Sequence, residues 1–178
     1  MLKLLALAAL VGAVPTSTAK VVLAPVAPAL IAADTMACLK HMSVKGLDSA
    51  GLEADGWKRY QPSDLPGRHF IASVAIYADG DGIALGDDSA LNPQSACTLV
   101  ALPTPSPDFG PIAEQLSAKL DAHPVFQKPG SVLWAPNGPD DVLIMLTKDP
   151  ERSDLVDVVM RASPRPANRV NAPIGQQG

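Results

Sequence analysis

Aromatic residues are scarce in this 178-residue chain, making up 4% of it, with two Trp, two Tyr and three Phe. A sugar-binding platform of aromatic rings is therefore not expected. Basic residues never gather into a cluster, and the formal net charge is −4. This charge distribution argues against nucleic acid or an anionic membrane surface as a partner.

Apolar runs long enough to span a bilayer are also missing, since a spanning helix needs about 20 such residues. The run Leu4–Val14 is shorter; it follows a positive charge at Lys3 and ends at Pro15. Ser17 and Ala19 then supply the two small residues of a cleavage site. This order is typical of a secretory signal peptide. We therefore predict a signal peptide over residues 1–19, no stable membrane span, and an exported protein that is periplasmic or extracellular.

Motifs for catalysis or cofactor binding are absent from the sequence. It has no Gly-x-Ser-x-Gly elbow, no Gly-x-x-x-x-Gly-Lys loop and no Gly-x-Gly-x-x-Gly before a helix. The acidic stretch Asp79–Asp88 fails the EF-hand pattern, because Ile83 and Ala90 occupy its fifth and twelfth positions. No cofactor is predicted, and whether the protein is an enzyme is left open.

Proline and glycine are plentiful instead, at 18 and 13 residues, and 47% of the chain is hydrophobic. Such a composition is typical of a loop-rich domain with an ample core. We predict one domain over residues 20–163. The last stretch, 164–178, is polar, contains proline and lacks aromatics, which predicts a disordered tail.

Periodicity predicts two main helices and an antiparallel sheet. From Ala29 a helical spacing of buried-type residues runs to Gly46, and a second helix covers residues 112–123 with Pro111 in its first turn. A short helix over Ser49–Asp55 lies between them, capped by Asp48 or Ser49. Strands are predicted at 57–60, 70–77, 82–86, 96–103, 131–135, 141–148 and 155–163. The expected fold is α+β, with both main helices packed on one face of the sheet, and a tandem αβββ pseudo-repeat is a further hypothesis.

The two cysteines have several interpretations. Cys38 and His41 stand three apart on one helix face, a spacing that can bind metal, but only His69 and His123 remain as further histidines. Lipidation at Cys38 is disfavoured, because no Leu stands three residues before it, and a catalytic thiol would need a positioned base. Two cysteines in an exported protein are most simply a pair. We therefore predict a Cys38–Cys97 disulfide and no metal site.

The sequence favours a non-catalytic binding module for an unknown protein or small ligand, of undetermined oligomeric state. We expect binding at an exposed sheet face or along an open edge of the final strand. Trp57, Tyr60 and Trp134 are candidate ligand-binding residues, with core packing as the competing interpretation of the two Trp. Two alternatives remain: a small exported hydrolase using Asp79–Asp88 and His69, or an envelope-associated structural protein held by the apolar segment 21–33.

Overall fold

The computed structural model describes residues 21–61, 75–88, 96–105, 108–136, 141–149 and 152–164. The predicted signal peptide, the predicted tail beyond Pro164, and His69 lie outside these ranges.

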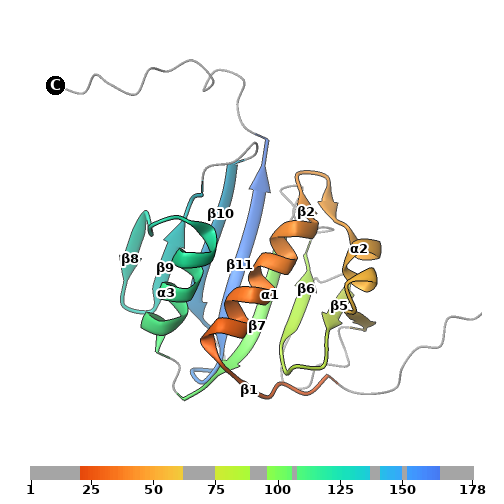
Figure 1. Ribbon diagram of the computed structural model, residues 1–178, viewed down its shortest axis with the longest axis horizontal. Helices are drawn as coiled ribbons and strands as arrows, with labels where there is room; N and C mark the ends of the chain where they lie inside the picture. Colours follow the sequence, from red (N-terminus) through yellow and green to blue (C-terminus); the bar gives the residue numbers. More distant parts are fainter. Residues whose placement is uncertain are drawn as a thin grey trace, which may run out of the picture.

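The fold is α+β, built on a mostly antiparallel nine-stranded sheet, as Figure 1 shows. Neighbouring strands follow the order β4 (Lys58–Tyr60), β5 (Ala75–Ala78), β6 (Ala84–Asp87), β7 (Ala96–Pro103), β11 (Val156–Ser163), β10 (Asp141–Lys148), β9 (Ser131–Trp134) and β8 (Phe126–Lys128). The short β1 (Pro25–Val26) pairs parallel to β7. A separate hairpin joins β2 (Met42–Ser43) to β3 (Gly46–Leu47). The predicted α+β class with an antiparallel sheet is therefore confirmed.

In the described part of the chain, three helices accompany the sheet: α1 (Pro28–His41), α2 (Ser49–Ala54) and α3 (Phe109–Leu120). Proline begins α1, where its fixed φ suits the first turn and its missing N–H costs nothing. Asp48 caps α2, as predicted, by accepting a 3.1 Å hydrogen bond from the Gly51 backbone N–H. Asp108 caps α3 in the same way through the Gly110 N–H. In Figure 1, α1 lies in front of β7 and α3 lies in front of β9, and the two helices are in contact.

The two faces of the sheet differ because side chains alternate along each strand. The main core contains residues of α1, α3 and the sheet, and its strand residues Tyr77, Leu99, Trp134, Ile144 and Val158 share the face that is called the inner face here. The opposite face, called the outer face here, carries the alternate residues of the same strands. Around β5 and β6 it is covered by the N-terminal segment: Val21 and Leu23 pack on Ile76, Ala78 and Ala84.

The final strand is not an edge, so that prediction is wrong. β11 is paired on both sides, with β10 from Asp141↔Ser163 to Lys148↔Val156 and with β7 from Val156↔Ala101 to Arg161↔Ala96. Its long apolar run reflects this central position, because a strand covered on both faces buries nearly every side chain. The ends of the strand order are β4 and β8. β8 lies between Pro124 and Pro129, and its three residues are too few to show a strand pattern in the sequence.

Candidate functional site

The two cysteines form the predicted disulfide between α1 and β7. Both residues are fully buried, and no free cysteine remains. Their sulfur atoms are occupied, so Cys38 is neither a metal ligand nor a nucleophile in this state. A disulfide is consistent with an oxidising, exported environment.

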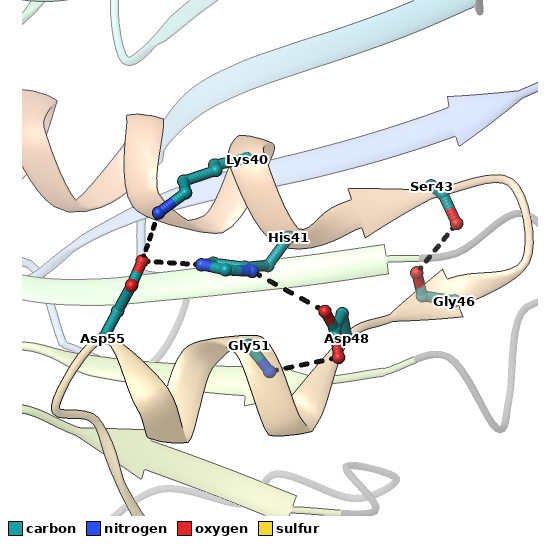
Figure 2. Close-up of polar contacts among 7 residues, drawn as sticks. All are labelled: Lys40, His41, Ser43, Gly46, Asp48, Gly51 and Asp55. Atoms are coloured by element: carbon teal, nitrogen blue, oxygen red, sulfur yellow. Dashed lines mark hydrogen bonds and ion pairs between the residues drawn. The ribbon is translucent and has the colours of Figure 1, made fainter.

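His41, the other half of the candidate metal pair, belongs to a polar network instead (Figure 2). Its Nε2 lies 2.8 Å from a carboxylate oxygen of Asp55, and its Nδ1 lies 4.0 Å from Asp48. Lys40 reaches the same Asp55 oxygen at 2.6 Å. The hydrogen bond from Lys40, and after it the contact with His41, lowers the pKa of Asp55 below its usual value.

This network fixes the end of α1 against α2. A Cβ on Gly51 would lie 2.4 Å from His41 Nδ1, so the absence of a side chain lets the imidazole lie on the α2 backbone. Among the residues that the structure describes, no three His, Cys, Asp or Glu side chains could hold a metal ion. The network therefore has the geometry of a structural clamp between helices.

The three candidate aromatic residues do not meet. Trp57 and Trp134 are buried in the main core, and the Trp134 Nε1–H donates a 3.0 Å hydrogen bond to the Ser117 hydroxyl on α3. Tyr60 lies on β4 and packs with the outer-face cluster around Ile76. Both Trp rings therefore lie in the core. Ligand binding by Trp57, Tyr60 and Trp134 stays a prediction, and the three side chains do not share one surface.

Exposed apolar side chains gather on the outer face of the second half of the sheet. Phe126 pairs with Leu133, Leu133 with Met145, and Met145 with Val159, which makes one row across four strands. Leu143 stands on the same face, two residues before Met145. Phe126, Leu143 and Met145 remain 50%, 45% and 36% exposed. We call the five residues Phe126, Leu133, Leu143, Met145 and Val159 the outer patch.

Two cations flank the outer patch. Lys128 Nζ lies 5.9 Å from the centroid of the Phe126 ring, a cation–π distance, and Arg161 stands directly opposite Leu143. Within the described ranges, no carboxylate forms an ion pair with either cation. The acids on this face, Asp141 and Asp157, already have interaction partners. The patch is therefore apolar in the middle with positive charge at its margins.

A cleft of about 700 Å³ adjoins β8 at the start of α3. Lys128 and Lys148 line it from the strands and Phe109 lines it from the helix. The third charged lining residue, Asp108, already accepts the Gly110 N–H. Lys128 lines the cleft and also flanks the outer patch at Phe126.

Asp34 is one of several buried acids that the sequence pattern does not predict to be buried. It is 7% exposed on α1, and its Oδ2 atom has no hydrogen-bond partner. Burial, followed by the nearby carboxylates of Asp79 and Asp81, raises its pKa from 3.8 to about 7. A signal was present in the sequence, because Asp34 stands at i+3 from Ile31 and just before Thr35 on the predicted buried face.

Comparison with known proteins gives no match: no protein-family model, no curated protein and no solved structure is similar to this chain. None of the helices in the described part of the chain has the length and apolar character needed to cross a membrane. What the structure defines is a disulfide-linked α+β domain with one partly exposed apolar sheet face.

Proposed function

We propose that the protein is an exported, non-catalytic binding module that holds an apolar, acidic segment of a partner protein on the outer patch. The observation that supports this most is the exposure of Phe126, Leu143 and Met145 on one continuous sheet face. Exposed apolar residues that form a contiguous patch, as opposed to scattered ones, mark interaction surfaces.

The chemistry of the partner follows from the margins of the patch. Lys128 and Arg161 favour carboxylates beside the apolar contacts. A second copy of this chain would bring the same two cations against themselves in a two-fold contact, which is unfavourable. An anionic lipid surface is disfavoured by the net charge of −4. An acidic, apolar polypeptide satisfies both the apolar centre and the positive margins.

The expected complex is weak and transient. Four strands spaced about 4.8 Å apart span only about 14 Å. The patch is therefore much smaller than the roughly 800 Å² that each partner buries in a standard interface. Each of the three exposed side chains is already partly covered, so each gains less than the roughly 1.5–3 kcal/mol of full burial. Most of that gain offsets the loss of translational and rotational freedom on association.

The architecture supports a further proposal, that the two halves of the domain are an internal repeat with both helices on one face. In the first half α1 precedes β4 to β7, with the β2–β3 hairpin and α2 in between, and in the second half α3 directly precedes β8 to β11. The strand order reads the same from either edge, with β7 and β11 meeting in the middle. Each repeat would then have four strands, one more than the αβββ unit expected from the sequence. In this arrangement the outer patch would correspond to the surface around Ile76 that Val21 and Leu23 cover in the first half.

The experiment is a binding titration with synthetic peptides of about 15 residues that combine Leu and Phe with Glu, compared with the same peptides carrying Lys in place of Glu. We expect the acidic peptides to bind and the basic ones not to bind. Leu143→Ser with Met145→Ser should weaken binding at least tenfold. The matched control is Val22→Ser, which removes a 73% exposed side chain outside the patch. Equal binding by the patch variant and the control would contradict the proposal, and so would binding only to a second copy or to anionic vesicles.

A further inference from the structure

The inner face of the sheet ends in the cleft beside the start of α3. Val132 on β9 pairs with Gln127 on one side and with Leu146 on the other, so these three residues share the inner face. Lys148 stands on the same face, two residues after Leu146. Val132 and Leu146 are buried in the main core, whereas Gln127 and Lys148 are exposed. The cleft of about 700 Å³ lies at this transition, and Phe109 lines it from α3.

Two lysines reach the cleft from different strands. Lys148 ends β10, and Lys128 ends β8 just before the Pro129–Gly130 turn. In the part of the chain that the structure describes, neither lysine forms an ion pair, whereas Lys40 does. The Gln127 side chain, which also lines the cleft, makes no hydrogen bond within the same ranges. All three polar groups can therefore turn towards a molecule in the cleft.

The start of α3 limits which anion suits the cleft. Asp108 is the acid of the lining, so two Lys and one Asp give the lining a formal charge of +1. This charge matches a monoanion. A phosphate at a helix N-terminus is bound by several free backbone N–H groups. Here the Gly110 N–H is taken by Asp108 at 3.0 Å, and Pro111 has no N–H to offer. A carboxylate is therefore a better match than a phosphate.

We propose that this cleft binds a small organic monocarboxylate, with Lys128 and Lys148 on its carboxylate and with Phe109 and Pro129 against its apolar body. The two ammonium groups and the Gln127 amide donate charge-assisted hydrogen bonds to the carboxylate oxygens. Apolar walls with a few convergent polar groups are the general form of a small-ligand site. A free carboxylic acid and a carboxylate on a peptide share this chemistry, and the experiment below separates them.

The cleft site is separate from the outer patch, although Lys128 contributes to both. Phe126 and Leu133 form a cross-strand pair on the outer face, and Val132 belongs to the inner face with Lys148. Lys128 comes directly before the turn, where its side chain lines the cleft and also lies over the Phe126 ring. Binding of a small carboxylate in the cleft therefore does not require the binding of a polypeptide on the outer patch, and either proposal can fail without the other.

An NMR titration of the intact, oxidised protein with phenylacetate tests the site. The backbone amides of Phe109, Gly130 and Lys148 should shift together, with a dissociation constant on the order of millimolar. Phenylacetamide, which has the same shape without the charge, and inorganic phosphate should both bind more weakly. Lys128→Gln and Lys148→Gln should each weaken phenylacetate binding roughly two- to fivefold, and the double variant should weaken it further. The matched control is Lys119→Gln, which removes an exposed lysine of α3 outside the cleft and should bind as wild type.

Asp108→Asn tests the site in the opposite direction. Asn caps a helix about as well as Asp, but it removes the negative charge of the lining, so phenylacetate should bind roughly two- to fivefold more tightly. The proposal is overturned if phenylacetamide or phosphate binds as tightly as phenylacetate, or if the double lysine variant binds as wild type. It is also overturned if Leu143→Ser with Met145→Ser abolishes the shifts, because the ligand would then lie on the outer patch. Shifts of these amides with a Glu-containing peptide but not with phenylacetate would assign the cleft to a peptide carboxylate and likewise overturn it.

Discussion

Removing the Cys38–Cys97 disulfide should lower the free energy of unfolding by about 4 kcal/mol. The bonded residues are 59 positions apart, and in the chain-entropy model a closed loop of that length restricts the unfolded chain by this amount. The magnitude is a large fraction of the 5–15 kcal/mol that holds a typical domain together. Both residues are fully buried, so reductant reaches the sulfur atoms only when the structure opens.

The assay is urea unfolding of three forms: oxidised wild type, reduced wild type, and Cys38→Ala with Cys97→Ala. Reduction isolates the cross-link, because it leaves both sulfur atoms in the core. The double variant should lose a further ~1–3 kcal/mol, since it also leaves small cavities. The denaturant slope should rise on reduction, because the unfolded chain becomes less compact. The reasoning is refuted if reduced and oxidised wild type unfold at the same urea concentration, or if reductant opens the bond much faster than the protein unfolds.

Two further predictions concern the clamp between α1 and α2. Gly51→Ala should destabilise the protein by about 1–3 kcal/mol and lower its melting temperature, because the new Cβ would collide with the His41 ring. Gly110→Ala, whose Cβ meets nothing closer than 3.6 Å, should be neutral or stabilising. A larger loss of stability in Gly110→Ala than in Gly51→Ala would contradict the clamp. Asp55 has a lowered pKa, so its contribution to stability is present above its ordinary pKa and is lost as the pH falls through the lowered value. Asp55→Asn should therefore lower the free energy of unfolding, measured in urea, at pH 7 and leave it unchanged at pH 2. An equal loss of stability at both pH values would show that the role of Asp55 is not electrostatic.

Local chemistry made much of the fold predictable. The strand Ala96–Pro103 and the strand Asp141–Lys148 have the bounds expected from their composition, and the Asp48 cap follows from its side chain. Strand order could not be predicted, because a periodic pattern shows that a strand is buried but does not identify its neighbouring strands. The final strand was for this reason predicted as an edge, although β7 and β10 pair with it on either side.

The candidate site was less accessible from the sequence. The disulfide could be inferred because the chain has only two cysteines. The outer patch could not, because its four-strand row depends on register and on β8, a three-residue strand between prolines. Asp34 was passed over because a helix face was assigned by its apolar members, and burial of a lone carboxyl needs tertiary contacts that periodicity does not contain. Trp57 and Trp134 illustrate the converse, since aromatic residues offered as ligand contacts proved to be buried.

The measurement that tests the binding proposal most directly is photo-crosslinking from the outer patch. A benzophenone amino acid would replace Met145 in one form of the protein and Glu114, exposed on α3, in a second. After irradiation with the acidic peptide that binds best, we expect a cross-link from position 145 that Lys128→Glu with Arg161→Glu abolishes, and none from position 114. Equal labelling from both positions, or labelling from 145 that survives the charge reversal, would contradict the assignment of the outer patch as a binding surface for acidic, apolar segments.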